Sequence, residues 1–194
     1  MAIRGKHKKR GSTLSLVLML VALIALIVLI IFWPVDAEAR TVAAKAAVEQ
    51  DDLAETTLIN VGDEAPNFSV EMLDGSTVTL SALRGQKVLL IFWATWCPPC
   101  RQEMSHLQEV IDANTDVVVL PISRGEKRDV VEAFLQKMGY TFPVGLDVEQ
   151  AIYRKYASNY IPRSFVIDGN GKVVYVGVGY DEAIAAEVQQ ALAN

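Results

Sequence analysis

The longest hydrophobic segment of the chain runs from Leu14 to Trp33 without a charged residue. It is 20 residues long, and none of its helical faces is polar. A helix needs about 20 apolar residues to cross the hydrocarbon core of a bilayer, whereas a helix at the surface of a soluble domain keeps a polar face. The pattern therefore predicts a single transmembrane helix over residues 14–33.

From residue 61 onward the pattern changes to short apolar runs, which are typical of a globular domain. Runs at 68–72 and 77–80 flank the Asp-Gly pair 74–75, a signal for a hairpin turn. Two further runs are continuously apolar, as buried strands of a covered sheet are. These runs predict strands over 87–93 and 116–122, with a short strand over 142–145 and a second hairpin over 164–167 and 172–178.

Helical spacing of apolar residues separates these strands. It predicts a turn of helix over 81–85, and helices over 97–113, 126–138 and 148–156. A last helix, capped by Asp181, is expected to end near residue 192. Strands that alternate with helices indicate an α/β fold with a mixed central sheet and helices on both faces. An N-terminal hairpin and the single transmembrane helix precede this fold.

Charge is distributed unevenly along the chain. Residues 1–13 contain five of the 18 basic residues and no acidic residue, so the remainder carries 13 basic and 23 acidic side chains. Basic residues flanking a membrane helix stay in the cytoplasm, so everything after residue 33 is expected outside it, at the cell (inner) membrane. The acidic outer part lacks the basic surface that nucleic-acid binding requires.

These features divide the chain into a cytoplasmic tail (1–13), a transmembrane signal anchor (14–33), a linker (34–60) and one domain (61–194). The linker is rich in alanine and acidic residues and has no aromatic residue. A cleaved signal peptide is the alternative to an anchor, with Ala37-Glu38-Ala39 as its cleavage site. The apolar run is longer than the 7–15 residues usual in signal peptides, which favours the anchor.

The only two cysteines stand together as Cys97-Pro98-Pro99-Cys100, directly after the apolar run 87–93. This order places Cys97 at the start of a helix, where the unpaired N–H groups and the helix dipole favour a thiolate. Cys100 lies one turn further on the same side. Cys97 is therefore expected to attack a partner's disulfide as the nucleophile, and Cys100 to resolve the mixed disulfide by forming a redox disulfide with Cys97.

The stretch FWATWCPPCRQE (92–103) resembles the active-site segment of thioredoxin-like proteins, above all the membrane-anchored TlpA/ResA branch. Residues 61–68, 123–147 and 160–168 resemble further segments of that branch, in the same order. The resemblance implies a thioredoxin-like fold and a cis-proline at Pro162, which would expose the backbone of Ile161 to an extended substrate. It also matches Glu103 to a glutamate of that branch, and a partly buried carboxylate at this position could shuttle the proton of Cys100 and raise the cysteine pKa values.

Other residues near these motifs have less specific readings. Trp96 is expected to shape the substrate-docking surface, and Trp93 to belong to the core. Glu103 could equally be a solvated residue of the first helical turn, where the dipole favours a negative charge. Arg163, which follows the candidate cis-proline, could face the substrate, but a solvated arginine is the favoured interpretation. Ile91 stands where thioredoxin itself carries a buried acid, so that proton route is missing.

The favoured function is an extracytoplasmic protein thiol-disulfide oxidoreductase that needs no cofactor. The resemblance implies reduction of oxidised proteins such as apocytochrome c in cytochrome c maturation, with electrons from a membrane thiol-disulfide donor. A net thiol oxidase is the alternative direction. A copper or zinc module using both thiolates is a different class, but beyond the cysteines the chain has only His7 and His106, and structural zinc needs four ligands. A structural clip is disfavoured because so short a loop removes little chain entropy.

Overall fold

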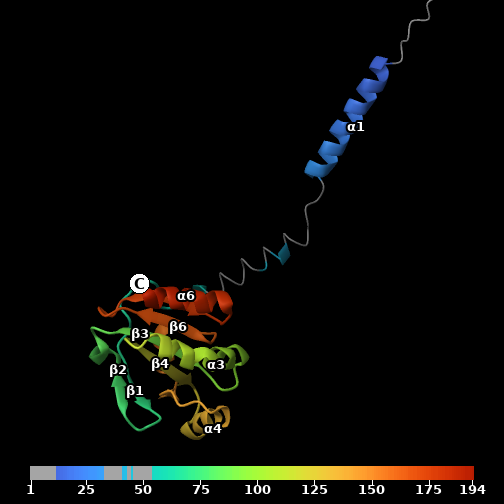
Figure 1. Ribbon diagram of the computed structural model, residues 1–194. Helices are drawn as coiled ribbons and strands as arrows, with labels where there is room; N and C mark the ends of the chain where they lie inside the picture. Colours follow the sequence, from blue (N-terminus) through green and yellow to red (C-terminus); the bar gives the residue numbers. More distant parts are fainter. Residues whose placement is uncertain (1–11, 33–40, 43–44, 46–53) are drawn as a thin grey trace, which may run out of the picture. The chain divides into compact units, whose positions relative to one another are not determined.

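The computed structural model describes residues 12–32, 41–42, 45 and 54–194 of the 194-residue chain (Figure 1). Two compact units are present, residues 1–49 and residues 50–194. Residues 1–11 of the predicted tail, most of the predicted linker and the alternative cleavage site at 37–39 lie outside the described residues.

The first unit contains one long helix, α1 (Ser12–Phe32), of 21 residues. Its described side chains, from Leu16 to Val28, are all exposed. In the part of the chain that the structure describes, no helix combines the length and the hydropathy that a membrane crossing requires. The transmembrane segment at 14–33 therefore stays a prediction.

A seven-stranded mixed sheet forms the centre of the second unit. The strands are β1 (Ser69–Met72), β2 (Thr77–Thr79), β3 (Lys87–Trp93), β4 (Val117–Arg124), β5 (Gly145–Asp147), β6 (Arg163–Ile167) and β7 (Val173–Val178). Their order in the sheet is β2-β1-β5-β4-β3-β6-β7. Strand β4 lies parallel to both of its neighbours, β3 and β5, whereas β6 runs antiparallel to β3 and β7. The predicted α/β class and mixed sheet are thus confirmed.

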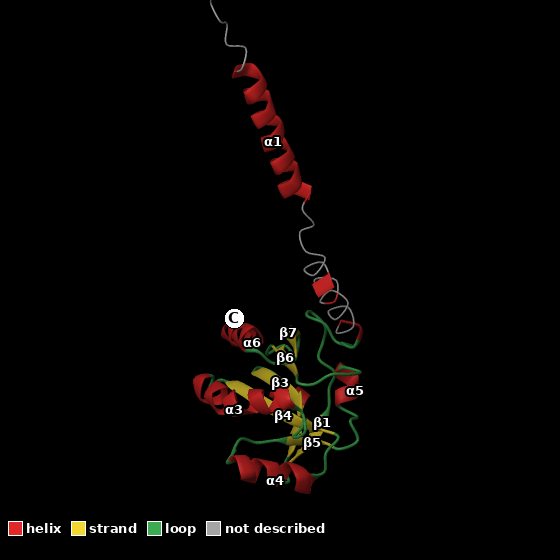
Figure 2. Cartoon of the chain, turned by 90° about the vertical axis from the view of Figure 1, so that its right-hand side faces the viewer, coloured by secondary structure: helices red, strands yellow, loops and turns green. Residues whose placement is uncertain are grey.

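Helices lie against both faces of this sheet (Figures 1 and 2). Helices α3 (Pro98–Ala113), α4 (Arg128–Met138) and α6 (Glu182–Ala193) cover one face, and the short α5 (Tyr153–Tyr156) lies on the other. Side chains alternate along β3, so each face receives its own core. Leu89, Ile91 and Trp93 pack with the cysteines and α3. Leu90 and Phe92 pack with Tyr153 and Tyr156 of α5.

Several element ends follow their sequence signals. Proline at 98 and 99 occupies the first turn of α3, where no N–H partner is needed. Gly139 ends α4 in the left-handed region, at φ 73°. The Asp181 carboxylate accepts the N–H of Ile184 at 2.8 Å and caps α6. The short helix η1 (Leu80–Leu83) closes at Gly85, which has φ 90°.

Other boundaries differ from the prediction. Strand β5 starts at Gly145 rather than at residue 142, since Pro143 has no N–H for the sheet. Helix α5 covers only residues 153–156, because the Asp147 carboxylate accepts the N–H groups of Ile152 and Tyr153 and holds the preceding segment as a turn. Helix α4 begins at residue 128 rather than 126.

The folded part of the second unit starts before residue 61, which is the domain boundary expected from composition. Thr57 forms a β-bridge with Ala157, and the Leu58 N–H donates to the Tyr156 carbonyl at 3.0 Å. The Thr56 carbonyl accepts the N–H of Ser158 at 2.9 Å. The end of the predicted linker is therefore hydrogen-bonded to the domain, because these backbone groups find partners beside α5.

Candidate active site

Strand β3 and helix α3 bring Cys97 to the edge of the sheet. The strand ends at Trp93, and the turn that follows is closed by a hydrogen bond from the Cys97 N–H to the Ala94 carbonyl, 3.2 Å long. Cys97 is the N-cap of α3, and its Sγ accepts the N–H of Cys100 at 3.3 Å. The sulfur thus lies at the positive end of the helix dipole, which stabilises a thiolate there.

Cys97 and Cys100 are joined in a disulfide, with an S–S distance of 2.09 Å and a Cα–Cα distance of 5.2 Å. Both cysteines are buried, Cys100 completely and Cys97 to all but 3%. Trp96, immediately before the pair, is 64% exposed. A large exposed aromatic beside a buried disulfide offers apolar area to an approaching partner.

The segment before β6 lies opposite the disulfide. Because β6 pairs antiparallel with β3, with Arg163 opposite Phe92, the residues before Arg163 reach the same end of the sheet as Cys97. The Ile161–Pro162 peptide bond is cis. The carbonyl oxygen of Ile161 lies 3.5 Å from the Sγ of Cys97. The structure thus brings together the two stretches, 96–103 and 161–162, that contain the candidate residues.

Glu103 lies one helical turn beyond Cys100 and points into the domain. Only 6% of the residue is exposed. Ser164 of β6 donates its hydroxyl to Oε1 at 2.9 Å, while Oε2 has no hydrogen-bond partner among the described residues. Burial raises the pKa of the Glu103 carboxyl from its ordinary 4.5 to about 7, although the Ser164 hydrogen bond acts in the opposite direction. A carboxyl with this pKa can take up or release a proton near neutral pH.

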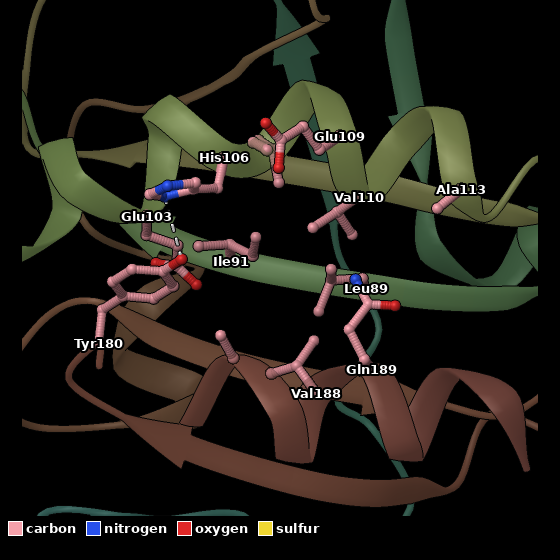
Figure 3. A pocket seen from close by; sticks show the side chains of 12 residues that line it. Leu89, Ile91, Glu103, His106, Glu109, Val110, Ala113, Tyr180, Val188 and Gln189 are labelled. Carbon is pink, nitrogen blue, oxygen red and sulfur yellow. Dashed lines mark hydrogen bonds between the residues drawn. The ribbon is translucent and has the colours of Figure 1, made fainter. Parts of the chain in front are cut away.

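Glu103 also lines a cavity of about 370 Å³ between α3 and α6 (Figure 3). The cavity wall is mainly apolar, with Leu89 and Ile91 of β3 at its base. At the end near Glu103, the ring of His106 stacks on Tyr180, and the Tyr180 hydroxyl lies 3.2 Å from His106 Nδ1. The His106 side chain is thus in contact with Tyr180 through both its ring and Nδ1.

The expectation that Arg163 is solvated is wrong. Arg163 is fully buried, and its guanidinium donates to the hydroxyls of Thr56 and Thr57 and to the carbonyl of Asn159. Burial lowers the pKa of Arg163. Arg163 is buried because β6 pairs antiparallel with β3 and places Arg163 opposite Phe92. The residues next to Arg163 in the sequence do not indicate this register.

Two further residues at the site, Thr95 and Glu126, were not found from the sequence. Glu126 was assigned to the start of a helix, but its buried carboxylate accepts the Thr95 N–H at 2.9 Å and the Thr95 hydroxyl at 2.5 Å. The two residues are 31 positions apart, so no local spacing signals the contact.

Among the residues that the structure describes, no group of three or more His, Cys, Asp or Glu side chains is arranged to hold a metal ion. In the described geometry the two sulfurs are bonded to each other, and this arrangement is suited to thiol–disulfide exchange. In that reaction, a thiolate at Cys97 attacks a disulfide and Cys100 completes the exchange.

Comparison with known proteins agrees with this chemistry. The model of the AhpC/TSA family matches residues 61–176. The thiol-disulfide oxidoreductase ResA of Geobacillus thermodenitrificans is 37% identical over 127 residues, which are 64% of this chain and 73% of that protein. ResA of Bacillus subtilis is 35% identical over 123 residues, covering 62% of this chain and 69% of the relative.

Solved structures show the same fold. A Chlorobium tepidum protein assigned as a candidate thiol:disulfide interchange protein DsbE has a TM-score of 0.60 at 34% identity, covering 69% of this chain and 99% of its own. StoA from Bacillus subtilis has a TM-score of 0.57 at 26% identity, covering 66% and 96%. The chain therefore belongs to the thioredoxin-like AhpC/TSA family and is a thiol-disulfide oxidoreductase of the ResA/DsbE type.

Proposed function

We propose that this oxidoreductase reduces disulfides of partner proteins outside the cytoplasm, for example apocytochrome c during cytochrome c maturation. The observation that carries the proposal is the Cys97–Cys100 disulfide at the N-terminus of α3, with exposed Trp96 beside it and the Ile161 carbonyl against its sulfur. A membrane thiol-disulfide carrier is the proposed electron donor, and the chemistry needs no cofactor.

The reaction begins with the reduced pair. The Cys97 thiolate attacks one sulfur of the partner disulfide, a new S–S bond joins Cys97 to the partner, and the other partner sulfur leaves as a thiolate and takes a proton. The Cys100 thiol then loses its proton and attacks Cys97 Sγ. The partner's second sulfur leaves, the partner has gained two electrons, and the Cys97–Cys100 disulfide remains for the donor to reduce.

We assign Glu103 the role of proton acceptor for Cys100. It stands three residues after Cys100 on α3, and its Oε2, which has no hydrogen-bond partner among the described residues, is able to accept a proton. Burial already holds its pKa at about 7, near that required of an acid and base at neutral pH. Trp96, Ile161 and Pro162 form the proposed docking surface, where the backbone beside Pro162 would pair with an extended partner segment.

Electron flow toward the partner is favoured by the surroundings of Cys100. The buried Cys100 sulfur, one helical turn from a buried carboxyl, is a poor place for a thiolate, so we expect a raised Cys100 thiol pKa in the reduced protein. Because ionisation of a thiol stabilises the reduced state, a Cys100 that stays protonated gives the dithiol less of this stabilisation and lowers the reduction potential. We expect a reduction potential of about −250 mV or lower for the full chain; a value of about −120 mV would reverse the assignment to a thiol oxidase. Equilibration with glutathione or dithiothreitol buffers measures it.

Partner proteins can be trapped with Cys100→Ser. Without Cys100, the mixed disulfide at Cys97 has no internal route to resolve, so we expect covalent adducts with protein partners in cells. Non-reducing gels and mass spectrometry identify them. The matched control is Cys97→Ser, which should trap none. Absence of adducts with Cys100→Ser, or equal adducts in both variants, would contradict the assigned order of attack.

We also propose that residues 14–33 anchor the thioredoxin-like domain to the inner membrane, with the basic tail (1–13) in the cytoplasm and a linker between the anchor and the domain. The support is a run of 20 uncharged residues, most of which lie in the single helix α1. Deleting residues 1–33 and adding a cleaved signal sequence should move the protein from the membrane to the soluble extracytoplasmic fraction. Mass analysis of the native protein distinguishes an intact anchor from cleavage near Ala39.

A further inference from the structure

The connection between β4 and α4 contains a carboxylate that the exchange reaction does not use. Glu126 is only 8% exposed, and its Oε2 accepts hydrogen bonds from the Thr95 N–H and the Ser123 hydroxyl, both 2.9 Å long. Its Oε1 accepts the Thr95 hydroxyl at 2.5 Å. All three bonds are donated to the carboxylate, and two of them come from one residue that stands two positions before Cys97.

Helix α4 does not explain the orientation of Glu126. A carboxylate just before a helix commonly caps its free N–H groups, but in the described part of the chain the N-cap residue of α4, Lys127, forms no side-chain capping hydrogen bond. Glu126 instead faces the end of β3, and Gly125 precedes it in the left-handed region at φ 75°. Burying a carboxylate costs free energy unless it is fully hydrogen-bonded. Two of the three hydrogen bonds to Glu126 come from Thr95, so the carboxylate stabilises the conformation of the segment that contains Thr95.

The bound segment is the turn that delivers Cys97. Thr95 lies inside the turn closed by the Cys97 N–H and the Ala94 carbonyl. Its two neighbours on the C-terminal side are the exposed Trp96 and then Cys97, whose sulfur accepts the Cys100 N–H. The orientation of Thr95 therefore determines where the sulfur sits relative to the helix terminus.

We infer that Glu126 is a positioning residue for thiol–disulfide exchange: by holding the N–H and hydroxyl of Thr95, it fixes the Ala94–Cys97 turn and keeps the Cys97 sulfur at the N-terminus of α3. The inference rests on the exchange activity itself and is independent of the direction of electron flow. Glu126 touches neither sulfur in this role; it acts through Thr95.

Thr95→Val tests the inference, because it removes the hydroxyl while preserving the size of the side chain and every charge. The variant leaves the charged and titratable side chains on the neighbouring elements in place, among them Arg101 and Glu103 on α3, Glu126 itself and Arg163 at the start of β6. A less firmly held turn should weaken the contact of the thiolate with the helix N-terminus. We therefore expect the Cys97 thiol pKa to rise and exchange with oxidised glutathione at pH 7 to slow about tenfold, the factor for one lost hydrogen bond to a charged group.

The experiment uses the reduced full chain in detergent, with the Cys97 pKa read from the pH dependence of alkylation by iodoacetamide. Thr95→Ser retains both donors and should restore the wild-type rate and pKa. Glu126→Gln should slow exchange by a similar factor, and the double variant Thr95→Val/Glu126→Gln should be no slower than the slower single variant, because both remove the same contact. Asp129→Asn, an exposed acid on α4, removes a charge nearby and should have no effect.

Three results would overturn the inference: wild-type rate and pKa in Thr95→Val, slowing without a shift of the Cys97 pKa, or equal slowing in Thr95→Ser. Thermal unfolding accompanies each variant, and if Glu126→Gln does not fold, the Thr95→Val and Thr95→Ser pair decides. Failure of the proposed reductase function would instead appear in the potential of the wild-type chain, which this comparison does not use.

Discussion

At the scale of single residues, Glu103 has the most unusual environment near the disulfide. Its carboxyl accepts a hydrogen bond from Ser164 and faces a mainly apolar cavity. Burial without a positive partner disfavours the charged form, so the proton is held more tightly than in water. The same environment that suits the group for proton transfer therefore costs the folded protein stability when the group ionises.

This cost predicts how stability depends on pH. In the unfolded chain the Glu103 pKa is near 4.5 and in the folded chain it is about 7, so the folded state binds more protons between these values. Stability should therefore fall as the pH rises from about 4.5 to about 7 and stay lower above it, by up to about 3 kcal/mol. Glu103→Gln cannot ionise and should be more stable than wild type at pH 8, but not at pH 4.

Chemical denaturation of the oxidised protein at several pH values measures this effect. Glu109→Gln is the matched control, since Glu109 is an exposed acid on the same helix that lines the same cavity. It should leave the pH profile unchanged. A profile for Glu103→Gln that follows the wild type would show that Glu103 ionises in the folded state as it does in water.

At the scale of elements, the N-termini of two helices have different roles: that of α3 holds the reactive sulfur, and that of α6 carries a cap that stabilises the helix. The N-terminus of α3 is capped by the reactive sulfur itself, which accepts the N–H of Cys100. The N-terminus of α6 is capped in the ordinary way by Asp181. Helix α6 covers the sheet beside α3 and forms one wall of the cavity at Glu103.

The Asp181 cap leads to a second stability prediction. Asp181→Ala removes the acceptor for the Ile184 N–H and the negative charge at the helix N-terminus, and should lower the free energy of unfolding by about 1 kcal/mol. Asp181→Ser retains a capping oxygen and should recover most of that loss. Urea denaturation at pH 7 distinguishes the two variants; an equal loss in both would mean that the charge matters and the cap does not.

At the scale of the whole molecule, the segment before residue 61 is tied to the active-site side of the domain through Arg163. This buried guanidinium, next to Pro162, donates to the hydroxyls of Thr56 and Thr57. Leaving the N–H groups of a buried charged side chain without hydrogen-bond acceptors costs free energy of folding. The segment thus completes the surroundings of the residue that follows the cis-proline.

Truncating the chain tests whether the hydrogen bonds from Arg163 to Thr56 and Thr57 stabilise the domain. A fragment covering residues 50–194 keeps both threonines, whereas one covering 61–194 removes them and leaves part of the Arg163 guanidinium without acceptors. We expect the shorter fragment to be less stable by about 3 kcal/mol. The double variant Thr56→Val/Thr57→Val in the longer fragment should lose a similar amount. Equal stability of the two fragments would place the domain boundary at residue 61 after all.

Local information was sufficient for much of this protein. The strand at 87–93, the helix that starts at the cysteines, the two hairpins and the Asp181 cap depend on side-chain periodicity, turn residues and capping groups that lie within a few positions of one another. The identity of the redox pair needed only two cysteines with two residues between them, at the start of a helix. Such features are decided by the chain's own neighbouring residues.

Tertiary structure alone decided which distant groups meet. The sequence left Glu103 open between a solvated and a buried carboxyl, and the packing of α3 against β6 made it buried. Arg163 was expected in solvent and lies in the interior, while Glu126 was expected in a helix and holds Thr95. In each case burial and charge environment depend on the register of strands and the packing of helices, which arise from contacts 31 to 107 residues apart and leave no trace in local spacing.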